Sequence, residues 1–145
     1  MQAGVNDVVH IHHNYCAWEN HFGRKVMVHR KGATTARTGE RGIIPGSMGT
    51  SSFIVVGNGN KESFTSCSHG AGRRMGRNEA NRTLAQDACK RAMKNVLFEW
   101  PADRRGRPDL SEAPQAYKDI DEVMSAQQEL VKPLLKLSPL AVIKG

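Results

Sequence analysis

The sequence predicts an α+β fold in which short strands and glycine-rich loops precede two helices and a terminal strand. Polar and apolar residues alternate with the period of a strand at residues 25–30. Glycine, serine, threonine and proline dominate residues 38–52, which is typical of a loop. Beyond residue 78 the apolar residues recur at helical spacing instead. With 145 residues, the chain is long enough for one domain around a single core.

Three strands are expected in the first half of the chain. Residues 8–12 alternate weakly, and residues 25–30 alternate clearly until Gly32 ends the pattern. The run at residues 53–56 is rich in β-branched residues and stops at the turn-forming sequence GNGN. We therefore expect these strands to be joined by loops, the longest of them at residues 38–52.

Two helices and a last strand are expected in the second half. Asn78 is a candidate N-cap for a helix that runs to about Lys94, since asparagine accepts a hydrogen bond from the first free amides. The residues expected on its buried face are Leu84, Ala88, Ala92 and Met93. Residues 101–114 form a polar connector with three prolines and three arginines.

The second helix is expected at residues 119–130, and Pro133 would end or kink it. Its predicted buried residues are Ile120, Val123, Met124 and Leu130. Residues 138–145 then predict a short final strand.

Charge and cysteine content restrict the function classes. Lysine and arginine number 21 against 14 aspartates and glutamates, so the net charge is +7. This excess favours a polyanionic partner such as nucleic acid or a nucleotide, although an ordinary basic surface explains it equally well. Cys16, Cys67 and Cys89 form no CxxC pair, which argues against a disulfide framework or a zinc knuckle. With no signal-peptide pattern and no long apolar run, we expect a cytoplasmic protein without a membrane partner.

Histidines and tryptophans supply further candidates. The sequence HIHHN would place His10 and His12 on one side of a strand and His13 on the other. Imidazoles are common metal ligands, but no carboxylate or thiol follows at a usual ligand spacing, so a merely polar strand stays an open alternative. Trp18 and Trp100 are expected to be packing anchors rather than platforms for base stacking.

The sequence SCSHGAGRRMGR, at residues 66–77, combines a possible nucleophile with an anion-binding turn. Gly70 and Gly72 allow the backbone to approach a ligand beside His69, and successive amides in such a turn can bind an anion. The nearby arginines are suited to phosphate, and imidazole can attack phosphorus. A glycine-rich turn around a buried histidine is the alternative. The loop PGSMGTSS, at residues 45–52, is a second candidate phosphate or base cradle, without the Walker pattern.

Six motifs together resemble the RtcB family of RNA-splicing ligases. They are HHNY, HRKGAT, IIPGSMG, SCSHGAGR, AYKDID and VIKG, in this order, and the resemblance runs from about Val5 to Gly145. It implies a partial RtcB-like fold and a ligase that joins an RNA 3′-phosphate or 2′,3′-cyclic phosphate end to a 5′-hydroxyl end. It also implies GTP and Mn²⁺ as cofactors and a guanylylated histidine as the intermediate.

The resemblance assigns roles to individual residues. His69 would be the catalytic nucleophile, and His13 would also bind manganese. The residues that would bind GTP are His13, Asn14, Pro45, Gly46, Ser47, Met48, Ser52, His69, Gly70, Ala71, Gly72 and Lys144. Those that would contact a phosphate or the base are Lys31, Arg73 and Tyr117.

The resemblance covers only the carboxyl-terminal portion of the family's ligase domain. The aspartate, cysteine and two histidines that complete the family's two-manganese site belong to the portion with no counterpart here. We therefore expect residues 1–145 to be a fragment, one half of a split ligase that requires a separate amino-terminal ligase fragment, or a shortened relative. The last would be a non-catalytic basic module that binds RNA or guanine nucleotide. We expect no catalysis by the isolated chain.

Overall fold

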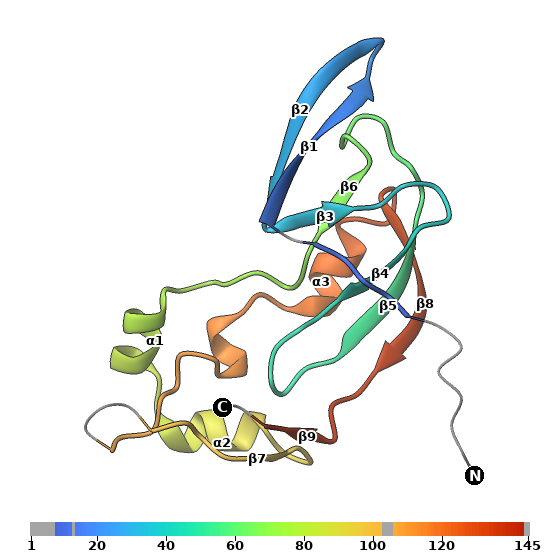
Figure 1. Ribbon diagram of the computed structural model, residues 1–145. Coiled ribbons are helices and arrows are strands. Elements are labelled where there is room, and N and C mark those ends of the chain that lie inside the picture. Colours follow the sequence, from blue (N-terminus) through green and yellow to red (C-terminus); the bar gives the residue numbers. More distant parts are fainter. Residues whose placement is uncertain (1–7, 13, 103–105, 144–145) are drawn as a thin grey trace.

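A computed structural model describes residues 8–12, 14–102 and 106–143, and it confirms the α+β class (Figure 1). Strands dominate the first half of the chain, and the longer helices follow them. A hairpin stands at one end of the molecule, a body of small sheets lies in the middle, and two helices lie at the other end (Figure 1). Within the described residues, no helix has the length and apolar character needed to cross a bilayer.

The hairpin consists of β1 (Asn14–His21) and β2 (Arg24–Lys31), paired antiparallel from Asn14 opposite Lys31 to His21 opposite Arg24. Its two turn residues, Phe22 and Gly23, both have positive φ, of 52° and 73°. A two-residue turn with positive φ matches the right-handed twist of the flanking strands. The predicted strand at residues 25–30 is confirmed. The strand predicted at residues 8–12 is wrong, because these described residues pair with no other strand.

Arg30 connects this hairpin to the body of the protein. Its side chain is 1% exposed and donates to the Ser66 hydroxyl at 2.9 Å and to the Phe64 carbonyl at 2.8 Å. Its two terminal nitrogens also donate hydrogen bonds to the carboxylate of Glu19, at 2.6 and 2.9 Å. A buried guanidinium needs such partners, because an unpaired buried charge is very costly. Arg30 therefore holds the inner face of the hairpin against the loop at residues 58–65.

The body contains two small antiparallel sheets. One pairs β3 (Ala33–Thr35) with β6 (Ser66–Ser68), and the other has the order β4-β5-β8, with bounds Arg41–Ile44, Ser52–Gly57 and Val131–Leu137. The strand predicted at residues 53–56 is confirmed as β5. The prediction of one loop over residues 38–52 is wrong in part, since β4 lies inside it. Ile44, which is fully buried, drives that strand into the core.

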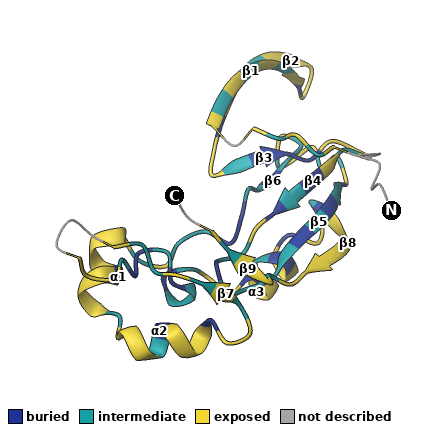
Figure 2. Cartoon of the chain, turned by 60° about the horizontal axis from the view of Figure 1, so that its bottom comes forward, coloured by how far each residue is buried: buried dark blue, intermediate teal, exposed yellow. Residues whose placement is uncertain are grey.

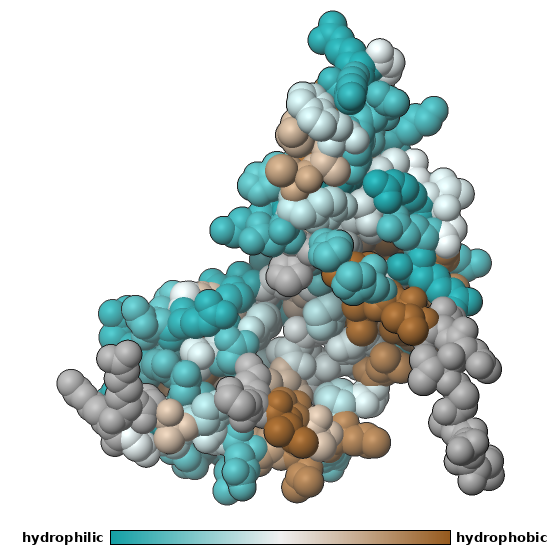
Figure 3. All heavy atoms as spheres, viewed as in Figure 1, coloured by the Kyte–Doolittle hydropathy of each residue, from teal (hydrophilic) through white to brown (hydrophobic). Residues whose placement is uncertain are grey.

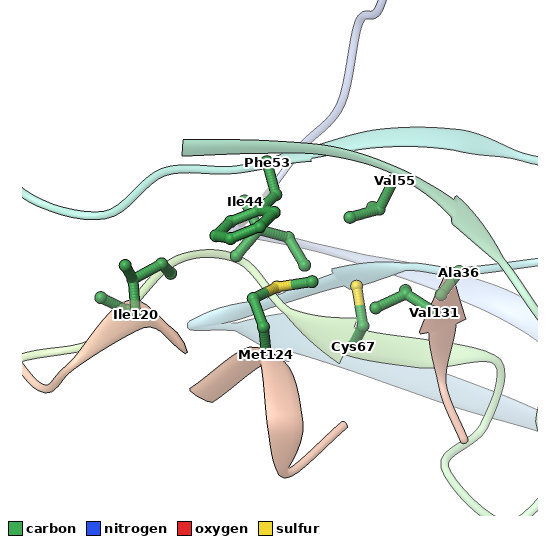
Figure 4. Close-up of a cluster of buried hydrophobic side chains, with 9 residues drawn as sticks. Ala36, Ile44, Phe53, Val55, Cys67, Ile120, Met124 and Val131 are labelled. Atoms are coloured by element: carbon green, nitrogen blue, oxygen red, sulfur yellow. The ribbon is translucent and has the colours of Figure 1, made fainter. Parts of the chain in front are cut away.

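The helix α3 (Ile120–Ser125) closes the core over these sheets (Figure 4). Asp119 caps it by accepting hydrogen bonds from the amides of residues 121 and 122. The buried cluster around it is Ala36, Ile44, Phe53, Val55, Cys67, Ala71, Ile120, Met124 and Val131. The helix ends five residues before the predicted end, and Pro133 neither ends nor kinks it. Pro133 lies in β8 instead, beside a shift in strand register, where an edge strand tolerates a residue without an amide proton.

The remaining helices are short and mostly exposed (Figure 2). The predicted helix at residues 78–94 is two helices, α1 (Arg77–Thr83) and α2 (Gln86–Ala92), because Leu84 and Ala85 are extended. Gly76, not Asn78, is the N-cap of α1. Of the predicted buried face, Met93 is buried and Ala92 is exposed.

A second, smaller cluster stabilises this end of the molecule. It contains Cys89, Leu110 and Ala113, with Leu84 and Trp100 packed against them. The short helix η1 (Pro114–Ala116) follows, and β7 (Leu97–Phe98) pairs in parallel with β9 (Ala141–Val142). The predicted final strand is thus confirmed at residues 141–142. On the face drawn in Figure 3, the most hydrophobic surface lies on the body and near β7 and β9, and the hairpin is mainly hydrophilic.

Candidate functional site

The turn that carries His69 follows β6 directly and is held from two sides. The amide of His69 donates to the Gly32 carbonyl at 3.3 Å, which extends the β3–β6 pairing by one step. The preceding amide, of Ser68, donates to the side-chain oxygen of Gln127 at 3.0 Å, and Gln127 is buried. The His69 ring is half-buried, and its Nδ1 atom lies inside the protein. The backbone that carries the imidazole is therefore held by hydrogen bonds to two other segments of the fold.

The turn and the loop at residues 45–52 touch each other. The amide of Ala71 donates to the Pro45 carbonyl at 2.9 Å. A Cβ atom on Gly70 would lie 3.1 Å from the same carbonyl oxygen, so a larger residue there would press the two segments apart. Gly72 has φ 73°, a conformation that glycine adopts without strain. Glycine is thus favoured at position 70 by the close approach of the Pro45 carbonyl, and at position 72 by the left-handed backbone conformation.

The loop at residues 45–52 is also held by hydrogen bonds within itself. The Thr50 hydroxyl accepts from the Ser47 amide at 2.7 Å and lies 2.9 Å from the Ser47 hydroxyl. A Cβ atom on Gly46 would lie 2.3 Å from the Ser51 carbonyl oxygen, so only glycine fits there. Met48 is buried, whereas Pro45 is exposed and Ser47 and Ser52 are half-buried. The loop therefore offers serine hydroxyls and backbone to a ligand, and Met48 contributes to packing.

Arg73 already has protein partners on every nitrogen of its guanidinium. It donates to the Met75 carbonyl at 3.1 Å, to the Tyr117 hydroxyl at 3.0 Å, to the Glu112 carboxylate at 3.3 Å and to the Ser111 carbonyl. The guanidinium also lies over the Tyr117 ring, 4.9 Å from its centre. Arg73 therefore fixes the turn to the segment at residues 111–117, and Tyr117 lies beneath it.

Tyr117 is part of the same network. Its hydroxyl donates to the Glu112 carboxylate. Burial and, after it, the Glu112 carboxylate raise the pKa of Tyr117 above its usual value of 10. The phenol therefore stays protonated at neutral pH. The amide of Lys118 donates to the Gly72 carbonyl at 3.0 Å, so this segment also supports the backbone of the turn.

Asn14 and Lys31 lie opposite each other at the base of the hairpin, and both are exposed. The next residue, Gly32, is the one whose carbonyl accepts from the His69 amide. The fold thus brings Asn14, Lys31 and the His69 turn to one place, although the sequence separates them by up to 55 positions. Lys31 and Asn14 can donate there to an anion.

Two predicted residues, His13 and Lys144, lie outside the described residues. Among the described residues, no group of three histidine, cysteine or acidic side chains is arranged to hold a metal ion. The His10 and His12 rings instead pack edge to face, with centres 4.8 Å apart. Arg74 and Arg77 are both exposed, but the Arg77 guanidinium lies 3.3 Å from the Glu112 carboxylate, so Arg74 is the better candidate for a phosphate contact.

Several residues that form the site gave no signal in the sequence. Gln127 and Glu112 act through contacts with partners 59 and 39 positions away. Thr50 differs from them, since it acts within its own loop, three positions from Ser47, and an SxxT spacing is typical of such a local hydrogen bond.

Comparisons with known proteins agree with the motifs. The family model described as tRNA-splicing ligase RtcB matches residues 1–145. The RNA-splicing ligase RtcB of Escherichia coli strain K12 is 48% identical over 144 residues, which cover 99% of this chain and 34% of that protein. The tRNA-splicing ligase RtcB of Nanoarchaeum equitans is 35% identical over 164 residues, covering 98% of this chain and 34% of that protein. The RNA-splicing ligase RtcB of Mycobacterium tuberculosis is 37% identical over 138 residues, covering 84% and 32%. The chain spans about a third of the length of the curated relatives it matches.

Proposed function

The chain belongs to the RtcB family of tRNA-splicing ligases, and we propose that it supplies the histidine-bearing part of an RNA ligase. This ligase would join RNA 3′-phosphate or 2′,3′-cyclic phosphate ends to 5′-hydroxyl ends, with GTP as the source of a guanylyl group on His69. One observation carries the proposal. The His69 turn, the loop at residues 45–52 and the base of the hairpin converge through backbone hydrogen bonds to Gly32 and Pro45.

His69 would act as the nucleophile through its Nε2 atom, because Nδ1 lies inside the protein. In that step a bond forms between Nε2 and the α-phosphorus of GTP, the bond from that phosphorus to the bridging oxygen breaks, and pyrophosphate leaves. The small residues Gly70, Ala71 and Gly72 would allow the phosphate to approach the backbone of the turn. The exposed Lys31 and Asn14 would donate to its oxygens.

The fit to the two proposed cofactors differs. The turn, with its left-handed Gly72 and its flanking cations, is suited to a nucleotide phosphate. Manganese would neutralise charge on the phosphates when bound, but the described residues do not form a cage for it. His13, the one proposed ligand, lies outside them. We therefore derive no step through the metal and expect its other ligands to come from an amino-terminal ligase polypeptide.

Transfer of label from α-³²P-GTP tests this function. The chain is incubated with Mn²⁺, with and without the amino-terminal polypeptide of an RtcB relative, and covalent label is measured after denaturation. The variant His69→Ala removes the nucleophile. The variant His29→Ala is the matched control, because His29 is an exposed histidine in the middle of β2.

We expect label on the wild type and on His29→Ala when the amino-terminal polypeptide is present, and none on His69→Ala. Label on His69→Ala would show that another residue is the acceptor. Absence of label under both conditions would refute the proposal and leave the alternative, a basic module that binds RNA or guanine nucleotide without chemistry. In that case affinity for RNA should depend on exposed arginines such as Arg74.

A further inference from the structure

A cavity of about 770 Å³ lies between the tip of the hairpin and the loops that follow β3 and β5. It is separate from the His69 turn, which lies at the base of the hairpin. Along the extended β1 strand, Trp18 lies about 13 Å from Asn14 at the base, and the tip at Phe22 lies about 26 Å from it. The proposed chemistry at His69 makes no use of this cavity.

Aromatic side chains form its rim. Trp18 is 62% exposed and Phe22 is 66% exposed, and both line the cavity. The prediction that Trp18 is a packing anchor is therefore wrong, whereas Trp100 does pack against a core cluster as predicted. Lys25 lies over the Trp18 ring, 5.7 Å from its centre. The Lys25 ammonium occupies one face of the ring, and the other face of this exposed ring can stack a nucleic-acid base.

The aromatic rim is held in an unusual backbone conformation. Phe22 has φ 52° and Phe64 has φ 55°, values at which a bulky side chain is strained by about 1–2 kcal/mol. Their ring centres are 5.6 Å apart, and the His21 ring lies 5.0 Å from Phe64. A hairpin turn of this kind normally carries asparagine or glycine at the first position. The contact between the Phe22 and Phe64 rings helps to hold Phe22 in this strained conformation.

The charges around the cavity favour an anion. Arg37 and Lys61 line it and are exposed, with the Arg37 side chain 56% exposed. Glu19 also lines it, but its carboxylate is bound by Arg30 and lies 3.4 Å from Arg37. The charge of Glu19 is thus balanced mainly by Arg30. Arg37 lies near two carboxylates, those of Glu19 and of Glu40 at 3.7 Å, but its side chain is largely exposed, and Lys61 adds an exposed cation.

We propose that this cavity binds one nucleotide of a single-stranded RNA, several nucleotides away from the end that reacts at His69. The base stacks on Trp18, with Phe22 at the rim, and the adjoining phosphate contacts Arg37 and Lys61. The identity of the ligand as RNA rests on the proposed ligase function, and the stacking and charge arrangement come from the cavity itself. Such a subsite adds affinity without reading sequence, because every base has an aromatic face.

Binding of a fluorescein-labelled ten-nucleotide oligouridylate with a 3′-phosphate tests the subsite by fluorescence anisotropy. We expect Trp18→Ala to bind about tenfold more weakly than the wild-type chain, as is usual for loss of one stacked base. Trp18→Phe should retain most of the affinity. Trp100→Phe is the matched control, and quenching of tryptophan emission by RNA should persist in it and disappear in Trp18→Phe. Circular dichroism of each variant verifies that it is folded.

The salt dependence of RNA affinity tests the contact between the phosphate and Lys61. Lys61→Gln should lower the slope of log affinity against log salt by about 0.7, the value for one lost contact to a single strand. Lys90→Gln, at an exposed position on α2, should not change it. Unchanged affinity in Trp18→Ala, or no measurable RNA binding by the wild-type chain, would overturn the subsite.

The GTP-labelling assay on the same preparations separates this inference from the proposed function. If His69 takes the label but Trp18→Ala binds RNA as the wild type does, the subsite is wrong and the function stands. If His69 takes no label while Trp18→Ala weakens binding, the subsite stands and the function falls.

Discussion

Replacing Glu19 by glutamine should destabilise the protein by about 3 kcal/mol at neutral pH. The Glu19 side chain is 10% exposed, and its carboxylate accepts two hydrogen bonds from Arg30, at 2.6 and 2.9 Å. His21 lies 2.8 Å from the same group, and Arg37 3.4 Å. These partners, Arg30 above all, hold the pKa of Glu19 at about 2, against its usual 4.5. Glutamine is similar in size but carries no charge, so Arg30 would remain buried with a weaker partner.

The magnitude follows from that pKa. The interval between 4.5 and about 2 corresponds to about 3 kcal/mol, at about 1.4 kcal/mol for each pH unit. Breaking a buried ion pair by removing one partner costs a similar amount, about 3–5 kcal/mol. Because the pKa of Glu19 is lower in the folded state, its stabilisation is complete above pH 4.5 and is lost as the pH falls towards 2. The difference between the wild type and Glu19→Gln should therefore shrink over this range.

Urea denaturation followed by circular dichroism at pH 7, 5 and 3 measures this difference. Glu129→Gln, at an exposed position, is the matched control and should change the free energy of unfolding by less than about 0.5 kcal/mol. A difference below about 1 kcal/mol at pH 7 would refute the argument that the Arg30 pair anchors the hairpin. So would a difference as large at pH 3 as at pH 7.

Two further predictions concern packing and thiol reactivity. Gly46→Ala should lower the free energy of unfolding by about 2 kcal/mol or more, because its Cβ would lie 2.3 Å from the Ser51 carbonyl oxygen. Thermal melting should separate it from Gly42→Ala, whose Cβ would meet only a valine methyl at 3.4 Å, and equal melting temperatures would contradict the reasoning. Burial raises the pKa of the Cys67 thiol to about 11, so Cys67 should react with a disulfide reagent at pH 8 more than about 100-fold more slowly than the exposed Cys16. Comparable rates for the two thiols in the folded protein would show that Cys67 is accessible.

The strands at residues 24–31 and 52–57 could be predicted, because their side chains alternate between two environments along most of their length. The strands β4 and β8 could not. Glycine and proline surround β4 in the sequence, and their composition concealed the buried Ile44. Pro133 suggested a break, yet β8 is an edge strand with a register shift, where proline is tolerated. For β4 and β8, local composition thus gave the wrong prediction, because the position of each segment in the fold determines its conformation.

The helix predicted at residues 78–94 failed for a different reason. Its apolar residues have helical spacing, but they belong to two short helices. Ala80 is the buried residue of α1, and Cys89 is the buried residue of α2. Leu84 lies between them in an extended conformation and joins the small cluster with Leu110. Helix propensity predicts poorly where tertiary packing stabilises a break between two helices.

The His69 turn illustrates how much of a site a sequence can predict. The glycines beside His69 indicated a tight turn near an anion, and Gly72 does adopt the left-handed conformation. The sequence could not show that the Arg73 guanidinium donates hydrogen bonds to the Glu112 carboxylate and to the carbonyls of Met75 and Ser111. The most distant of these partners lies 39 positions away. Three arginines in one run therefore have two different roles. Arg73 and Arg77 share the Glu112 carboxylate, and the exposed Arg74 remains a candidate for phosphate.

The two tryptophans carry the same lesson further. Each has a glutamate as a neighbour, Glu19 after Trp18 and Glu99 before Trp100, so local polarity does not distinguish the two tryptophans. Trp100 lies where the connector folds back on a buried cluster. Trp18 lies on a hairpin whose inner face is occupied by the Arg30–Glu19 pair, so its outward side chain has no core to enter. The same ion pair that fixes the hairpin therefore also fixes the strand that carries the Trp18 ring at the rim of the cavity.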